Sequence, residues 1–597
     1  MSKKILSSLI IVFCSYSFVN AQSEHLMWYR YPAKEWNEAL SLGNGSMGAM
    51  VFGGTRVERI QLNEETIWSG APQPRTIAPD YSERKAKARQ LIFEGKHDKA
   101  EKIIRSLKIE QYEGNDGIQI NGVTSTEHGY ETAGDIFLYF DADHEQETHY
   151  RRQLDIKNAL ASTEFTRAGV NYSREVLSSY PDKVLAIRLK SSNIVNFISP
   201  PKKLKAVYPS ITESISNDHL IMKGQASNQG AEFEIHLKAV LVDGTSEKKG
   251  EGLQIKNSSE VILYVHITSD YYGDNLSLRA TTILDNAVKK GYQQIKQDHI
   301  VDFSSLSKRV ELDLGKGNDR YPLDVRLRYI RHRVEDPRYF KGQLTDPGLI
   351  SLFYHFNRYM LISSSRPGTL PPALHYWNNS LYPAWYGRPT TNVNQQMNYW
   401  GAEVASLSEC HLPMLNLMEE FLPVGKEVAQ KAYQSNGAVF PGRGIAITHA
   451  PEFIYDTWND AGGWFSSHFF DHYLFSMDKE YLKQHAYTYM KEITLFYLDN
   501  LVKHPTEGYL ITGPSFSAET SYKLEEKIYH YSNGVTLSKG IINETLKNTL
   551  KAAKILNVDK ELQQKLEVII PKLSPYKVRK RYGFLQEWDE DYEGTNA

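Results

Sequence analysis

Cysteine is nearly absent from this chain. Its 597 residues contain two, Cys14 and Cys410. Two cysteines cannot build the disulfide framework that holds small exported domains together. The chain is also longer than one hydrophobic core can serve, so we expect several domains, each held by its own apolar core.

Long apolar runs are scarce as well. One run, from Ile5 to Val19, follows Lys3 and Lys4, and Val19-Asn20-Ala21 after it offers a small-residue cleavage site. This pattern is typical of a secretory signal peptide, and the run is too short and wrongly flanked for a membrane span. We therefore expect a signal peptide over residues 1–21 and an exported protein, periplasmic or extracellular. No membrane insertion is expected after signal cleavage.

An excess of charge of either sign is missing too. The 69 basic and 71 acidic residues leave a net charge of −2. A basic stripe for nucleic acid or a polybasic membrane patch is therefore not expected. The sequence shows no phosphate loop, dinucleotide fingerprint or nucleophile-elbow serine, because the GNGSMG stretch lies between expected strands without a helix to bind phosphate.

Aromatic residues are abundant, with 38 tyrosines and nine tryptophans. A flat apolar face with a hydrogen-bonding tip suits stacking on sugar rings, although such side chains serve large cores equally well.

The pattern of the first part of the chain is that of β-structure. Strands are expected in MGAMVFGG, GDIFLYF, VNYSREVLSSY, VLAIRLK, FEIHLKAVLVDG and VILYVHIT, which favour an antiparallel β-super-sandwich over residues 22–280. One helical island, from Glu83 to Leu107, is split at Gly95, and we expect it to lie across the outside of the sheets.

Helical periodicity takes over further along the chain. Residues 281–344 are expected to form a helical linker and residues 345–597 a helical barrel or toroid whose long loops build a site at one end. Helices are predicted at Gly348–Ser363, Met397–Phe421, Trp464–Phe475, Glu480–Val502, Thr536–Leu556 and Lys560–Leu573.

The segment NVNQQMNYW places two asparagines two residues apart, at Asn392 and Asn394. If the segment is extended, both side chains leave the same face and can hold one small polar object, such as a water molecule or a sugar hydroxyl. The alternative is a turn or capping role beside the start of a helix.

A hydrolytic site also needs a proton donor, and Glu519 in ITGPSFSAET is the best candidate. Its loop follows a short apolar run, and Phe516 and Tyr522 could raise its pKa by limiting solvation. The alternative is an ordinary solvated glutamate.

His468 and His472 have the i,i+4 spacing of a helical metal pair. A third ligand is not evident, so we expect core or substrate-contacting histidines rather than zinc ligands. No metal and no cofactor are expected.

Longer stretches resemble a known family. The resemblance to glycoside hydrolase family 95, the inverting α-L-fucosidases, starts at WNEALSLGNGSMGAMVFGGTRVERIQLNEETIWSG and continues in order through YRRQLDIKNALASTEF, LISSSRPGTLPPAL, NVNQQMNYW, GGWFSSHFFDHY and LQEWDEDYE. It implies a multidomain β + α protein with an N-terminal β-super-sandwich, a helical linker and an (α/α)6 barrel that carries the site.

The same resemblance implies an inverting hydrolysis of terminal α-L-fucose from a glycan. Glu519 matches the general acid, although its usual SPEN setting reads SAET here, and Asn392 with Asn394 matches the pair that positions the attacking water. Trp464 and His468 fall where the family lines its sugar pocket. Acid and base must stand roughly 6.5–9.5 Å apart to leave room for the water.

Two departures from the family pattern matter. Thr390 stands where many members carry a histidine, which favours α-L-galactosidase activity as an alternative, because a hydroxyl could hydrogen-bond the extra C6 hydroxyl of L-galactose. The sequence also ends at Ala597, before the segment that supplies the family's catalytic base. We therefore expect an incomplete (α/α)6 barrel with uncovered apolar faces, and weak or absent hydrolysis.

Other functions remain open at this point. A non-catalytic glycan-binding remnant would keep a partial pocket without turnover, an inverting phosphorylase would use phosphate in place of water, and a bare scaffold would bind no ligand. Linkage, aglycone and oligomeric state are not determined by the sequence.

Overall fold

The structure is a computed structural model that describes residues 25–595 apart from several short segments. These segments are 71–75, 78–79, 108, 111–117, 121–122, 126–128, 141–144, 200, 203–209, 274, 336–345, 441–443, 448–450, 455–457, 518–519 and 580–582. The expected signal peptide and Glu519 lie outside the described residues. Across the described part of the chain, no helix is long and apolar enough to cross a membrane.

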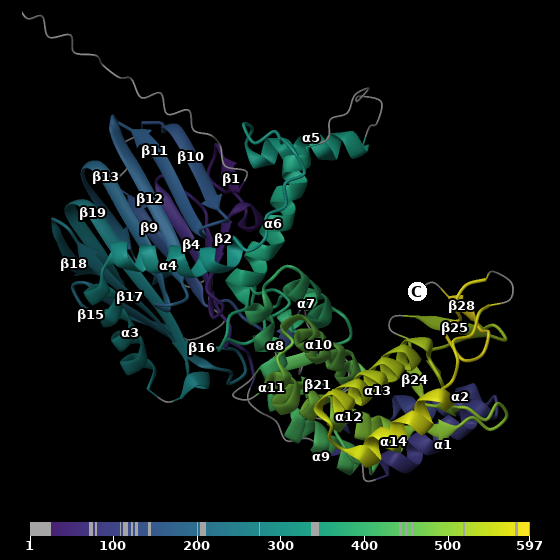
Figure 1. The fold of residues 1–597 in the computed structure, drawn as a ribbon. Helices are drawn as coiled ribbons and strands as arrows, with labels where there is room; N and C mark the ends of the chain where they lie inside the picture. Colours follow the sequence, from purple (N-terminus) through teal and green to yellow (C-terminus); the bar gives the residue numbers. More distant parts are fainter. Residues whose placement is uncertain are drawn as a thin grey trace, which may run out of the picture.

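The N-terminal half is an antiparallel β-sandwich (Figure 1), as predicted. Its main path runs in the order β1 (Leu26–Tyr29), β10 (Thr148–Asp155), β11 (Leu160–Arg167), β12 (Val170–Ser179), β13 (Val184–Ser199), β19 (Gly252–Ser269), β17 (Glu232–Leu241), β16 (His219–Gln225) and β15 (Ser210–Ser216).

A second branch leaves the long strand β13. It consists of β9 (Gly134–Phe140), β4 (Val57–Glu64), β3 (Met47–Val51) and β2 (Leu40–Gly43), with β14 (Pro201–Lys202) on β9 and β18 (Thr245–Lys249) on β19. The core between the branches contains alternating apolar residues such as Leu62, Leu138 and Leu263. All six quoted strand predictions coincide with a strand.

Two helices cover the outside of the sandwich (Figure 1). They are α3 (Leu276–Lys290) and α4 (Tyr292–Ser307), and Leu284 and Ile295 pack on Ile262 and Tyr264 of β19. Helix α5 (Leu323–Glu335) follows, and the chain then enters the helical half.

The helical half consists of sequential helices joined by long loops, as predicted. They are α6 (Pro347–Ser364), α7 (Asn394–Val404), α8 (Ser408–Glu420), α9 (Leu422–Tyr433), α10 (Ala461–Ser476), α11 (Lys479–Tyr481), α12 (Tyr487–Asn500), α13 (Thr536–Leu556) and α14 (Lys560–Ile569). The single helix expected over Met397–Phe421 is two helices, because Ala405–Leu407 interrupts it.

Further short strands form small separate sheets outside the sandwich sheet. They pair as β5 (Thr76–Ile77) with β6 (Ile109–Glu110), β7 (Ile118–Ile120) with β8 (Val123–Ser125), β20 (Gly444–Ile447) with β21 (Pro451–Ile454), β22 (Val502–Lys503) with β23 (Leu510–Ile511), β24 (Ser515–Phe516) with β27 (Tyr531–Ser532), and β25 (Ser521–Leu524) with both β26 (Lys527–Tyr529) and β28 (Glu593–Thr595).

The two halves share apolar cores. Tyr359 and Ile362 of α6 belong to the sandwich core, while Trp68 and Tyr130 from the sandwich belong to the core of the helical half. Some apolar side chains of the helical half are exposed, for example Phe353 of α6 and Val404 of α7.

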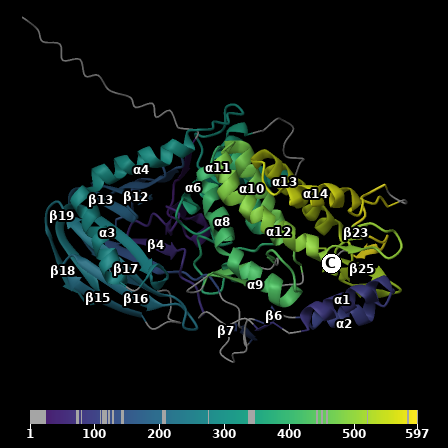
Figure 2. The ribbon, with the colours of Figure 1, turned by 60° about the horizontal axis from the view of Figure 1, so that its bottom comes forward.

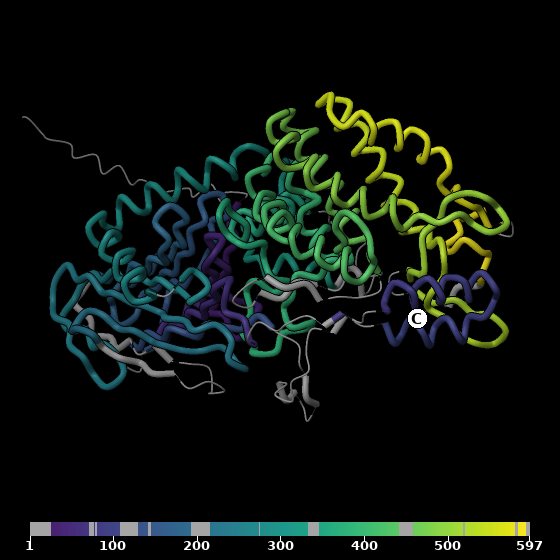
Figure 3. The backbone as a smooth tube through the Cα atoms, turned by 90° about the horizontal axis from the view of Figure 1, so that it is seen from below, coloured from purple at the N-terminus to yellow at the C-terminus, as the bar shows by residue number. Residues whose placement is uncertain are grey.

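The helical island is split at Gly95 into α1 (Tyr81–Phe93) and α2 (His97–Arg105), as predicted, but its expected position is wrong. Figures 2 and 3 show the pair beside the C-terminal part of the helical half, far from the outer face of the sandwich. Helix α1 contacts α9, and α2 contacts β26. The apolar faces of the two helices pack mainly on each other, and Tyr531 from the C-terminal part of the chain packs against this small core.

Candidate active site

The asparagine pair lies where α7 begins. The segment is a turn followed by the helix, so the extended condition does not hold. Asn392 is half-buried in the turn, and Asn394 is the first helical residue, with an exposed side chain. The Thr390 hydroxyl donates a hydrogen bond of 2.6 Å to Asn394 Oδ1. This contact fixes the carboxamide oxygen of Asn394 at the N-terminal end of α7. The NH2 group of the same side chain can then donate to a ligand.

Two tryptophans stand on neighbouring helices. The rings of Trp400 on α7 and Trp464 on α10 have centroids 6.4 Å apart, and Trp400 is 55% exposed. Exposed indoles present flat apolar faces with an N–H group, a surface that sugars can stack on. Trp400 is a neighbour that the resemblance did not single out.

His468 belongs to a buried polar network. The carboxylate of Glu403 accepts hydrogen bonds from His411 Nδ1 (2.8 Å), from His472 Nδ1 (2.7 Å) and from Ser408 Oγ (2.5 Å). Because a carboxylate only accepts, His411 carries its proton on Nδ1 and its Nε2 accepts from His468 Nδ1 at 3.0 Å. His468 therefore presents an unprotonated Nε2.

The pKa values follow from this burial. Desolvation, and then the neighbouring His411, lower the pKa of His468 to about 3, so the ring is neutral at any ordinary pH. Burial would raise the pKa of Glu403, but the hydrogen bonds from its two histidines and from Ser408 hold it well below its usual range.

Glu403 and His411 complete a group with His472 whose possible metal-ligating atoms lie within 4.8 Å of one another. Sequence spacing did not reveal these two residues, because they reach the histidine pair only when α7 and α8 pack on α10. Each contact is already a good hydrogen bond, which fits the expected core role of the histidines.

Glu519 lies outside the described residues, but its surroundings are described. Ser517 hydrogen-bonds Glu587 of the LQEWDE segment, and the rings of Phe516 and Tyr531 meet edge to face at 5.9 Å. Tyr522 is fully buried, with its hydroxyl against His97 of α2. The base of this loop is thus held from two sides.

A separate large cavity lies between the sandwich, α6 and α7. Its volume is about 840 Å³, and its lining includes Trp377, Met397 and Asn398. None of the residues singled out from the sequence lines it.

Comparisons with known proteins agree with this architecture. Residues 291–597 match the model of the glycosyl hydrolase family 95 catalytic domain. The chain belongs to glycosyl hydrolase family 95. Residues 27–274 match the N-terminal domain of glycosyl hydrolase family 65, which covers the sandwich of this family 95 protein. The chain is a glycoside hydrolase.

Among curated relatives, the chain is 27% identical to "Alpha-L-fucosidase 2" of Arabidopsis thaliana, over 94% of this chain and 69% of that protein. It is 26% identical to "Probable alpha-fucosidase A" of Aspergillus niger, over 81% of this chain and 61% of that protein. The chain thus spans about two thirds of the length of these relatives.

Among solved structures, a putative kojibiose phosphorylase from the human microbiome superposes with a TM-score of 0.59 and 12% identity. The match covers 95% of this chain and 72% of that chain. At this identity the likeness concerns the fold alone.

Proposed function

We propose that this family 95 protein removes terminal α-L-fucose from glycans by inverting hydrolysis. The observation that carries the proposal is the family 95 match over the helical half, joined to relatives whose names state fucosidase activity. The exposed indole of Trp400 on α7 and the Thr390–Asn394 hydrogen bond at the start of the same helix add a physical reason, because a sugar needs both an apolar face and fixed polar groups.

In the proposed reaction, Glu519 protonates the glycosidic oxygen while a water molecule held by Asn392 and Asn394 attacks the anomeric carbon from the opposite face. The water passes its proton to a carboxylate base as it attacks, so a single displacement inverts the anomeric carbon. His468 Nε2, which can only accept, would take a hydrogen bond from a sugar hydroxyl. Trp464 would cover an apolar face of the ring.

The alternative is α-L-galactosidase activity, and the hydrogen bond between Thr390 and Asn394 bears on it. The Thr390 hydroxyl already donates its hydrogen to Asn394, so it can only accept from a ligand. A C6 hydroxyl of L-galactose can donate to it, whereas L-fucose has no such group.

The test compares aryl α-L-fucoside and aryl α-L-galactoside with the purified protein, following the anomer released by proton NMR. We expect β-L-fucose as the first product, with Glu519→Gln and Asn394→Ala each lowering kcat by roughly 10²–10⁴-fold. Thr390→Val should lower any galactoside rate more than the fucoside rate. Initial release of the α-anomer would overturn the inverting mechanism.

A measurement of L-fucose binding tests the hypothesis that the protein binds glycans without cleaving them. L-fucose binding by calorimetry without hydrolysis of either substrate supports a glycan-binding remnant, and Trp464→Ala should then abolish the binding heat. Phosphate-dependent cleavage would support a phosphorylase, and absence of both binding and turnover would overturn the proposal.

We also propose export, on the strength of the N-terminal apolar run and its cleavage site. N-terminal sequencing of the protein produced with an intact export pathway should start at Gln22, and an intact Met1 would contradict it.

A further inference from the structure

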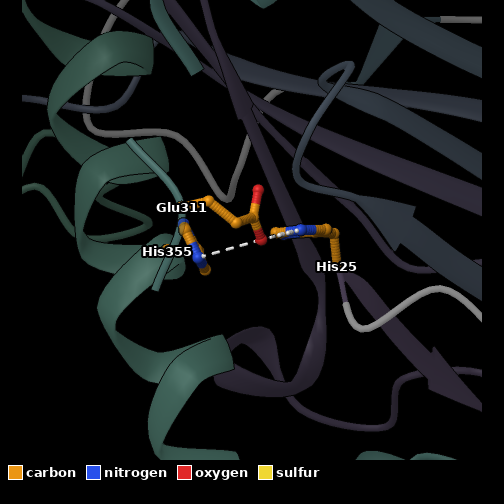
Figure 4. A group of neighbouring side chains, drawn as sticks. All are labelled: His25, Glu311 and His355. Carbon is orange, nitrogen blue, oxygen red and sulfur yellow. Dashed lines mark hydrogen bonds and ion pairs between the residues drawn. The ribbon is translucent and has the colours of Figure 1, made fainter. Parts of the chain in front are cut away.

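A second group of ligating side chains lies apart from the residues of the candidate active site. His25 precedes β1, Glu311 follows α4, and His355 lies on α6, so three separate segments contribute one side chain each. Figure 4 shows both imidazoles turned toward the same carboxylate. The two histidines are buried, at 8% and 6% exposed.

The distances converge on one oxygen atom. His25 Nε2 lies 2.8 Å from Glu311 Oε1, and His355 Nε2 lies 3.5 Å from the same atom. The two rings meet edge to face, with centroids 4.7 Å apart. The N–H group of Leu312 donates to His355 Nε2 at 3.1 Å, so this nitrogen is unprotonated.

We propose that this cluster is a zinc site, with His25 Nε2, His355 Nε2 and Glu311 Oε1 as ligands and a water molecule in the fourth position. In a tetrahedral site with bonds of ~2.0–2.2 Å, neighbouring ligand atoms stand about 3.3–3.5 Å apart. The His355–Glu311 separation of 3.5 Å meets that range, the His25–Glu311 separation of 2.8 Å lies below it, and all three atoms lie within 4.8 Å of one another. Small side-chain shifts are enough to admit the ion.

The donor set selects the kind of metal. Two imidazoles and one carboxylate suit Zn²⁺ and its transition-metal neighbours, whereas Mg²⁺ and Ca²⁺ prefer oxygen ligands throughout. The Glu311 side chain is 48% exposed, which gives the ion a route from solvent. Zinc needs a bare nitrogen at His25 Nε2, so the hydrogen shared with Glu311 must move to Nδ1, and the Leu312 hydrogen bond to His355 must break. Because metal ligands must be unprotonated, the affinity falls at acid pH.

Lys157 forms an ion pair with the carboxylate of Glu311. Its Nζ lies 3.3 Å from Glu311 Oε2, which leaves Oε1 for the metal, but its positive charge opposes a cation nearby. Replacing Lys157 with methionine should therefore strengthen zinc binding.

The site would join the start of the sandwich, the segment after α4 and the first helix of the helical half. A ligand that binds the folded state alone stabilises that state by mass action. Zinc here would thus act as a structural clamp between the halves rather than as part of the hydrolytic reaction.

The experiment uses the full chain after chelator treatment, titrated with ZnCl2 in a calorimeter and melted with and without the metal. We expect a zinc-dependent rise in Tm and a saturable heat of zinc binding. His25→Ala, His355→Ala and Glu311→Gln should each weaken this binding at least 10-fold, and Lys157→Met should tighten it. Mg²⁺ should give neither signal.

His149→Ala provides the matched control, because this exposed histidine lies outside the cluster and its loss should leave the affinity unchanged. Among the described residues, two other groups have metal-ligand spacing, Glu403–His411–His472 and His504–Asp589–Glu590. Equal zinc affinity and equal Tm shift in the wild type and in Glu311→Gln would overturn the proposal. This variant is decisive even if a histidine variant misfolds, since the side chain is half exposed.

Discussion

In the interior of the helical half, the carboxylate of Glu403 accepts hydrogen bonds from the imidazoles of His411 and His472. The i,i+4 spacing of His468 and His472 was visible in the sequence, and their placement on one helix is confirmed. Their partners Glu403 and His411 were not predictable, because no local spacing relates α7 and α8 to α10. The buried carboxylate of Glu403 sets the tautomers of His411 and His472. Through His411 it also leaves Nε2 of His468 as an acceptor.

Glu403→Ala should destabilise the protein by about 3–5 kcal/mol, because it leaves two buried ring N–H groups without an acceptor. Glu403→Gln, which keeps one acceptor oxygen, should cost less. Urea unfolding measures both. Glu409→Gln is the control, since its ion pair with Arg309 is exposed and should contribute at most about 1 kcal/mol.

The effect of Glu403→Ala on the free energy of unfolding should depend on pH. The pKa of Glu403 is lowered in the folded state, so its stabilising contribution is present above the unfolded value of 4.5 and is lost as pH falls below it. The difference in unfolding free energy between the wild type and Glu403→Ala should shrink below about pH 4.5. A difference that grows in acid would contradict this account.

At the scale of elements, α1 and α2 show that sequence periodicity determines where helices form, whereas packing determines where they dock. The 3.6-residue spacing of apolar residues predicted the helices and Gly95 predicted the break, and both are confirmed. The docking surface depended on contacts such as Asp98 with Lys527 and Tyr529, which are too distant in sequence for any local pattern to indicate.

Ile104 tests whether the small core that α1 and α2 share holds this helical pair in place. The side chain is 1% exposed and packs in the small core that α1 and α2 share. Ile104→Ala should lower the free energy of unfolding by about 2–5 kcal/mol and expose residues 81–107 to limited proteolysis. Lys102→Ala, an exposed change on the same helix, should alter neither. Cleavage at equal rates in the two variants would indicate that the pair is not held by this core.

At the scale of the whole molecule, a pair of buried acids lies where the two halves meet. Burial raises the pKa of Glu64 to about 7, although hydrogen bonds from Thr66 lower it. Burial, and then repulsion from Glu64, raise the pKa of Glu65 well above its usual range. Glu65 accepts from the Leu370 N–H group at 2.7 Å and from the Tyr272 hydroxyl at 2.6 Å, and so links the sandwich to the loop before α7.

This pair predicts that the protein loses stability as pH rises. Between the unfolded value of 4.5 and the raised folded values, the native state binds more protons than the unfolded state, so the free energy of unfolding falls. Each acid contributes a slope of at most about 1.4 kcal/mol per pH unit. Glu65→Gln should flatten the profile between pH 5 and 8 in urea unfolding, and exposed Glu83→Gln should not. An unchanged slope in Glu65→Gln would contradict the assignment.

The sequence by itself determined the alternation of the sandwich strands, the positions of most helices and the family resemblance, because periodicity and short motifs are local properties. The tertiary structure alone decided that Glu403 of α7 accepts from His472 of α10, and that α1 and α2 dock on the far half. It also decided that His25, Glu311 and His355 meet. Each of these depends on contacts between segments distant in the chain, and such contacts are set by the packing of apolar faces.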